Sequence, residues 1–125
     1  MQLGVVGLGF LGSRHARKLA ARGGAPLLFF DRQIERAADL AGELGGRDVK
    51  GLGEIAESCD AVIVATNTES HAAITLERLA AGCHVLVEKP IASTLAEADR
   101  MIESARAAGR VLAVGHVGSV NPALP

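Results

Sequence analysis

Six residues near the start of the chain have the spacing of a phosphate-binding turn. Gly7-Leu8-Gly9-Phe10-Leu11-Gly12 matches G-x-G-x-x-G, directly after an apolar run and directly before a helical pattern. Gly7 permits the tight turn, Gly9 lets the backbone approach a pyrophosphate, and Gly12 lets the helix pack closely. The first helical turn then offers its N–H groups to the phosphates. The structural alternative is an ordinary strand-to-helix turn with packing glycines.

An acidic residue supports the phosphate-binding interpretation. Asp31 ends the apolar run Leu27–Phe30 and follows Gly12 by about 20 residues, where a carboxylate accepts hydrogen bonds from an adenosine ribose. The carboxylate would repel a 2′-phosphate, which favours NAD. Arg32 keeps NADP as the second cofactor, because a guanidinium pairs with phosphate or stacks on adenine. Asp31 as a helix N-cap and Arg32 as a solvated surface charge remain the structural alternatives.

The elements that must position these residues alternate along the chain. Short apolar runs separated by helical patterns predict an α/β fold, a doubly wound parallel sheet of the Rossmann type with about six strands in the order 3-2-1-4-5-6. In the first helix the spacing places Leu11, His15, Leu19 and Ala20 on one stripe. The expected strands are 3–6, 27–30, 61–65, 84–87 and 111–114, with a weaker one at 48–50, and the expected helices are 11–22, 34–44, 52–57, 70–81 and 95–108.

Composition narrows the classes of partner. The 125 residues include 13 basic and 14 acidic side chains, a balance that argues against nucleic acid or a membrane surface as a partner. No apolar stretch approaches the ~20 residues that span a bilayer. Cys59 and Cys83 do not form a disulfide framework, so we expect buried free thiols in a cytoplasmic protein. We expect no metal site.

Four further segments carry a family resemblance: Ala65–His71, Ala81–Val87, Glu88–Pro90 and Val114–His116. With the glycine turn, they resemble the N-terminal domain of the glucose–fructose oxidoreductase / inositol dehydrogenase / rhizopine catabolism (Gfo/Idh/MocA) family over nearly the whole chain. Glu-Lys-Pro after a strand that begins Gly-x-His-Val is the specific signature. The closing Gly-His-Val and Asn-Pro are similar to the nucleotide-sugar dehydrogenase branch.

The resemblance implies a role for each matching position. The residues implied to bind the cofactor are Gly7, Gly9, Phe10, Leu11 and Gly12 at the pyrophosphate, Asp31 and Arg32 at the adenosine, Thr66, Asn67 and His71 at the end of the fourth strand, and Glu88 beside the nicotinamide. His71 has a structural alternative, as a helix residue bonding nearby backbone. His84 is expected to be structural, and His15 to be a packing residue within reach of the phosphate loop.

Lys89 is the expected catalytic residue. It follows a buried strand and Glu88, and it precedes Pro90, which biases it toward an extended conformation at the edge where parallel sheets bind ligands. An ammonium there can hydrogen-bond a substrate hydroxyl or exchange a proton with it. A surface lysine in a turn is the alternative.

The expected function is that of an oxidoreductase domain acting on a CH–OH group of a sugar, polyol or nucleotide sugar. Residues 1–117 are expected to form the dinucleotide-binding domain and 118–125 a tail where the family's second domain would begin, that domain being absent. Gly118-Ser119-Val120 stands where the branch has a charged and aromatic segment. We therefore expect cofactor binding without turnover, a sugar-like substrate only with a second domain, and self-association through the exposed surface.

Three other functions stay open at this point. A non-catalytic NAD-binding module or truncated product fits the missing second domain. A β-hydroxyacid dehydrogenase shares the Gly-Leu-Gly-x-x-Gly opening, but Glu88-Lys89-Pro90 argues against it. A methyltransferase-type nucleotide fold is disfavoured because the spacing through Gly12 suits a pyrophosphate.

Overall fold

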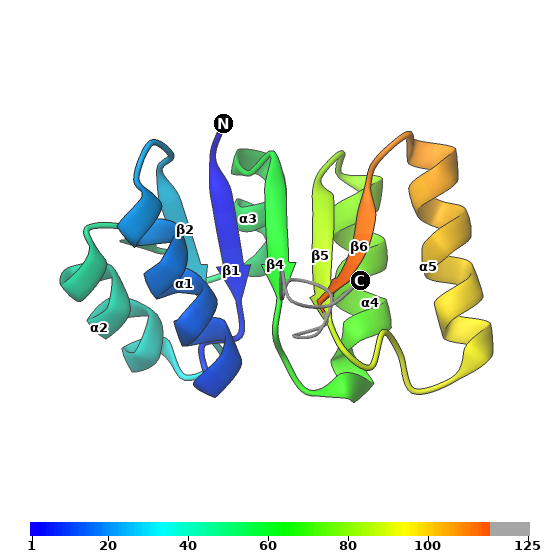
Figure 1. Ribbon diagram of the computed structural model, residues 1–125, viewed down its shortest axis with the longest axis horizontal. Helices are drawn as coiled ribbons and strands as arrows, with labels where there is room; N and C mark the ends of the chain where they lie inside the picture. Colours follow the sequence, from blue (N-terminus) through cyan, green and yellow to red (C-terminus); the bar gives the residue numbers. More distant parts are fainter. Residues whose placement is uncertain (116–125) are drawn as a thin grey trace, which may run out of the picture.

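The computed structural model describes residues 1–115, and it contains one six-stranded parallel sheet in the order β3-β2-β1-β4-β5-β6 (Figure 1). The predicted fold class and strand order are confirmed. The predicted tail 118–125 and the last two residues of the predicted domain 1–117 lie outside the described residues. The elements are β1 (Leu3–Val6), α1 (Phe10–Arg22), β2 (Leu27–Phe30), α2 (Ile34–Leu44), β3 (Arg47–Asp48), α3 (Leu52–Ser58), β4 (Ala61–Val64), α4 (Thr68–Ala80), β5 (His84–Glu88), α5 (Leu95–Ala108) and β6 (Leu112–Gly115).

The strand β1 is central and sets the register of the sheet. Leu3 pairs with Leu27 of β2 on one side and with Ala61 of β4 on the other. Because neighbouring strands run parallel and nearly flush, their carboxyl ends meet at a single edge. The loops after β1, β2, β4 and β5 therefore converge there, and this edge is where an open α/β sheet binds ligands.

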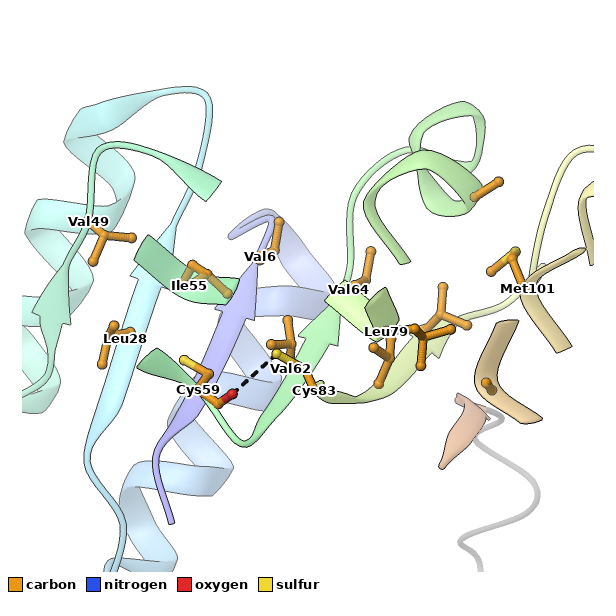
Figure 2. Close-up of a cluster of buried hydrophobic side chains, with 14 residues drawn as sticks. Val6, Leu28, Val49, Ile55, Cys59, Val62, Val64, Leu79, Cys83 and Met101 are labelled. Atoms are coloured by element: carbon orange, nitrogen blue, oxygen red, sulfur yellow. Dashed lines mark hydrogen bonds between the residues drawn. The ribbon is translucent and has the colours of Figure 1, made fainter. Parts of the chain in front are cut away.

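Helices cover the two faces of the sheet in different places (Figure 1). On one face α1 and α2 pack over the first half, with Val5, Ala16 and Phe29 in the core. On the other face lie α3, α4 and α5, and Figure 2 shows their side of the core, including Ile55 and Leu79. Aliphatic and alanine side chains fill both layers, as expected for strands covered on both faces.

The cysteines belong to the second core layer. Cys59 and Cys83 are both buried and free, which bears out the prediction of small apolar thiols. The Cys83 thiol donates to the Cys59 carbonyl oxygen at 3.2 Å (Figure 2). Burial raises the pKa of Cys59 to about 11 and also raises that of Cys83.

The first helix confirms most of the predicted stripe. Leu19 and Ala20 are partly buried against the core and His15 is partly buried, whereas Leu11 is 41 % exposed. The most buried residues of the helix are Gly12 and Ala16, which the prediction left out. At Gly12 the helix lies so close to the preceding turn that a Cβ would overlap the Gly7 carbonyl oxygen, so only glycine fits there.

Within residues 1–115, one stretch of the sheet has no helix packed over it. On the α1 face, an apolar groove of about 220 Å³ runs over β4, β5 and β6, lined by residues that include Ile63, Leu86 and Ala113. Among residues 1–115, no helix is long and apolar enough to cross a membrane. The same described part holds no group of three His, Cys, Asp or Glu side chains arranged to hold a metal.

Candidate functional site

A cleft of about 980 Å³ opens at the carboxyl edge of the sheet. It lies at the point where the chain leaves β1 for one face and β4 for the other, and its size is that of a small-molecule site. Most of the predicted cofactor residues line it, while Gly12, His71, Glu88 and Lys89 do not. The lining consists of Val6, Gly7, Leu8, Gly9, Phe10, Leu11, Phe30, Asp31, Arg32, Gln33, Arg36, Leu52, Ala65, Thr66, Asn67, Ser70 and Ile74.

The three glycines of the turn are required for different reasons. Gly7 has φ +88°, and a Cβ there would lie 2.7 Å from the Ala65 carbonyl oxygen. A Cβ on Gly12 would overlap the Gly7 carbonyl oxygen. At Gly9 the nearest atom to a Cβ would be Arg36 Nη1 at 3.9 Å, so a side chain there would project into the open cleft. The missing side chain leaves that space for a ligand.

The amino terminus of α1 is prepared for an anion. Its N-cap, Gly9, makes no side-chain capping bond, and the first turn contains no acidic residue. The first N–H groups of a helix have no acceptor within the helix, and here they face the cleft. Phe10 is 75 % exposed at the rim, with the Arg14 guanidinium 5.5 Å from its ring centre.

Asp31 fixes the glycine turn to the second strand. Its Oδ2 accepts from the Leu8 N–H and its Oδ1 from the Gln33 N–H, both at 2.7 Å. The N-cap of α2 is Gln33, so Asp31 is not the N-cap. Each carboxylate oxygen has a second lone pair, which leaves Asp31 able to accept from a ribose hydroxyl.

Two arginines line the cleft near Asp31. Arg32 was predicted and lines the cleft, with its side chain exposed. Arg36 was missed: its Nη1 lies 3.8 Å from Asp31 Oδ2. Its position in the first turn of the helix after the acidic residue was the available signal, because that turn faces the same crevice. Sequence reasoning also missed Gln33, Leu52, Ser70 and Ile74 in the lining.

The loop after β4 supplies the opposite wall. Asn67 is the N-cap of α4, and its side-chain amide donates to Glu69 at 2.8 Å. The Ser70 hydroxyl donates to Asn67 Oδ1. Thr66 and Asn67 thus reach the cleft as predicted in position, held by a local hydrogen-bonded loop.

His71 lies behind that wall. Only 1 % of the residue is exposed, and its ring joins two loops: Nδ1 is 2.9 Å from the Pro90 carbonyl oxygen and Nε2 is 3.0 Å from that of Thr66. The geometry matches the backbone-bonding alternative considered for this histidine.

The Glu88–Pro90 segment continues from β5 at the same edge. Glu88 is 9 % exposed and its Oε1 is paired with His15 Nε2 from α1. A Cβ on Gly115 of β6 would come 3.0 Å from the same oxygen, so the carboxylate is enclosed on both sides. Lys89 is exposed, and the peptide bond between it and Pro90 is cis.

Comparison with known families agrees with this geometry. Residues 1–116 match the family model described as an oxidoreductase family with an NAD-binding Rossmann fold, GFO_IDH_MocA. The chain is 40 % identical over 124 residues to the UDP-N-acetylglucosamine 3-dehydrogenase of Acidithiobacillus ferrooxidans, covering 99 % of this chain and 39 % of that protein. The chain thus spans about two fifths of that relative's length.

Superposition on solved structures also matches this chain to dehydrogenases and a ketoreductase. The Acidithiobacillus ferrooxidans dehydrogenase superposes with a TM-score of 0.92 at 38 % identity, over 99 % of this chain and 41 % of its own. GenD2 from gentamicin A biosynthesis, solved with NAD, gives 0.90 at 34 % identity, with coverages of 98 % and 36 %. A 3-ketoreductase from Actinomadura kijaniata, solved with NADP, gives 0.90 at 28 % identity, with coverages of 98 % and 39 %.

Proposed function

Since the chain belongs to the Gfo/Idh/MocA oxidoreductase family and forms its NAD-binding Rossmann fold, we propose that it serves hydride transfer at a CH–OH group of a sugar, polyol or nucleotide sugar. One observation carries the proposal: the uncapped amino terminus of α1 and the Glu88–Pro90 segment lie at one edge of one sheet. The dehydrogenase and ketoreductase relatives support the substrate class.

The residues of the cleft fit a dinucleotide. In the proposal, the free N–H groups of Gly9, Phe10, Leu11 and Gly12 hold the pyrophosphate, because the helix dipole and the empty space at Gly9 favour an anion there. Asp31 accepts from the adenosine ribose. A bound nicotinamide would supply the hydride acceptor.

The remaining predicted residues complete the binding site. Arg32 lies beside the adenine end, and Thr66 and Asn67 form the wall toward the nicotinamide. Glu88 is the last residue of β5 and directly precedes Lys89, the proposed catalytic residue. NAD is the proposed cofactor, because the Asp31 carboxylate disfavours a 2′-phosphate, and NADP is the alternative.

Lys89 is the proposed catalytic residue. Its exposed side chain follows the buried Glu88 at the strand end. The ammonium form donates a hydrogen bond to the substrate hydroxyl oxygen, and the neutral amine accepts the proton that the hydroxyl loses. Its role is to orient the carbinol and to move that proton.

The first test measures binding by the 125-residue chain alone. Isothermal titration with NAD should give a saturable site, and Lys89→Ala should leave the Kd for NAD nearly unchanged. Lys18→Ala, on an exposed position of α1, is the matched control. Absence of NAD binding by the folded chain would overturn the cofactor assignment.

The second test measures turnover. The chain is joined to the remaining part of the Acidithiobacillus ferrooxidans dehydrogenase, and reduction of NAD is followed with polyols and nucleotide sugars. Lys89→Ala should lower kcat at least about 100-fold, as expected for a lost general acid–base group. Wild-type turnover in that variant would remove Lys89 from the chemistry. If the chimera binds NAD but oxidises nothing, the non-catalytic alternative is favoured.

Compartment and assembly complete the proposal. Two buried free thiols suit the reducing cytoplasm. The apolar groove over β4, β5 and β6 is the surface through which we expect copies to associate when nothing else covers it. Equilibrium sedimentation measures the association.

A further inference from the structure

Both neighbours of Lys89 are held by histidines from other parts of the chain. His15 of α1 pairs with the side chain of Glu88, and His71 of α4 contacts the carbonyl oxygen of Pro90. The two helices pack on opposite faces of the sheet, as Figure 1 shows. Lys89 therefore stands between two anchor points, one approached from each face.

We propose that His15 and His71 are positioning residues that hold Lys89 in register with the dinucleotide cleft. The inference rests on the proposed function of Lys89. Each histidine also contacts or belongs to an element of that cleft: His15 follows the glycine turn in α1, and His71 contacts the carbonyl oxygen of Thr66. The reacting side chain and the cofactor-binding backbone are thereby fixed to one another.

The His71 contacts are specific in direction. Carbonyl oxygens only accept, and a neutral imidazole carries one N–H, so the tautomer decides which of the two carbonyl oxygens the ring bonds while the other lies beside the second nitrogen. Nδ1 faces Pro90 and Nε2 faces Thr66. Because the residue is 1 % exposed, water does not replace a lost partner easily, and removing the ring frees both loops at once.

The His15 contact is enclosed as well. Glu88 is 9 % exposed, with α1 on one side and the bare backbone of Gly115 on the other. Gly115 places backbone and no side chain next to the carboxylate on the β6 side, and the side chain that the carboxylate pairs with is that of His15. The backbone that carries Glu88 continues directly into Lys89.

Replacing each histidine with asparagine or glutamine distinguishes a positioning role from a contribution to stability alone. An asparagine amide nitrogen falls near the place of a histidine Nδ1, and a glutamine amide nitrogen near that of Nε2. His71→Asn should keep the Pro90 bond, whereas His71→Gln should keep only the Thr66 bond. His15→Gln should keep a donor toward Glu88, and His15→Ala should not.

The first measurement uses the 125-residue chain without any substrate. Hydrogen–deuterium exchange should speed up in segment 88–92 for His71→Gln and His15→Ala, with less change for His71→Asn and His15→Gln, and with α5 unchanged in all four. Equal exchange in segment 88–92 for both members of each pair would overturn the proposal, whatever Lys89 does.

The second measurement uses the chimera. His71→Gln and His15→Ala should lower kcat by about 10- to 100-fold, as a misplaced catalytic group does, with a much smaller change in KM for NAD. The asparagine and glutamine partners should recover most of kcat. If Lys89→Ala has no effect while exchange behaves as expected, the proposed function fails and the positioning contacts stand.

Discussion

At the amino-terminal edge of the sheet, Asp60 and His84 connect the starts of neighbouring strands, whereas at the carboxyl-terminal edge Asp31 and His71 connect the loops around a cleft. Asp60 Oδ2 accepts from Gln2 N at 2.7 Å, and His84 Nδ1 accepts from Val111 N at 3.0 Å. Both bonds close the start of a strand. At this edge an aspartate and a histidine therefore connect adjacent strands, away from the cleft.

At the other edge the bonds connect loops that carry ligand-facing groups. Asp31 holds the turn before α1 to the end of β2, and His71 holds the loop after β4 to the one after β5. The difference follows from topology. Chains leaving β1 and β4 for opposite faces open a crevice only at the carboxyl edge, and its walls need ties between elements.

The largest expected effect comes from adding a side chain at Gly12, next to the glycine turn that lines the cleft. Gly12→Ala places a methyl group on the Gly7 carbonyl oxygen, so the turn must shift or the helix must move away. We expect a loss of about 3 kcal/mol in the free energy of unfolding, as for an overpacked site, and no measurable NAD binding. Urea unfolding and calorimetry measure the two quantities.

A glycine away from the cleft supplies the control. Gly42 lies inside α2 with nothing near a Cβ, so Gly42→Ala should raise stability by about 0.5–1 kcal/mol and leave NAD binding intact. If both substitutions weaken binding equally, the turn is not the phosphate site.

Removal of the Asp31 charge should have the next largest effect. Asp31→Asn removes the repulsive charge but turns its amide NH2 toward one of the two N–H groups that the carboxylate accepts from. Both cofactors should therefore bind more weakly, and the preference for NAD over NADP should narrow by about tenfold, or 1.4 kcal/mol. Asp31→Ala should weaken both cofactors further, because the Leu8 N–H loses its acceptor. Calorimetry with both cofactors measures the ratio, and an unchanged ratio would assign discrimination to Arg32 or Arg36.

The sequence predicted the parts of this edge that are encoded locally. The glycine turn and Asp31 follow from a short motif and a fixed spacing, and the strand order follows from alternating elements. The pairing of His15 with Glu88 joins positions 73 residues apart, and no local pattern marks it. In α1 the apolar spacing predicted the partly buried Leu19 and Ala20 but not the buried Gly12 and Ala16, because small residues carry no strong apolar signal.

Ionisation of the thiols at the amino-terminal edge should lower the free energy of unfolding without changing NAD affinity. The pKa of Cys59 rises from 9.0 to about 11, first through burial and then through Cys83 and Asp60, so folding disfavours its thiolate. The contribution of the protonated Cys59 thiol to the free energy of unfolding is fully present below pH 9 and is lost as the pH rises toward 11. The free energy of unfolding should fall by about 1 kcal/mol at pH 10.

The comparison for that prediction is Cys59→Ala. Urea unfolding at pH 8 and pH 10 should show a smaller decrease in the variant than in the parent chain. An identical decrease would mean that other groups account for the alkaline loss. NAD affinity at pH 8 should be the same in both proteins, because the thiol lies at the far edge of the sheet from the cleft.

The smallest expected effect tests the contrast between the edges directly. His84→Ala removes the acceptor of the Val111 N–H at an exposed position, where water takes its place, so stability should fall by only about 0.5–1 kcal/mol. His84→Asn should restore it, because the asparagine oxygen can occupy the place of Nδ1. Neither variant should change NAD affinity or hydrogen exchange in segment 88–92, in contrast to His71→Gln. A change in NAD affinity or in hydrogen exchange of segment 88–92 in His84→Ala would show that the amino-terminal edge is coupled to the cleft. The proposed contrast between a structural edge and a ligand-binding edge would then be wrong.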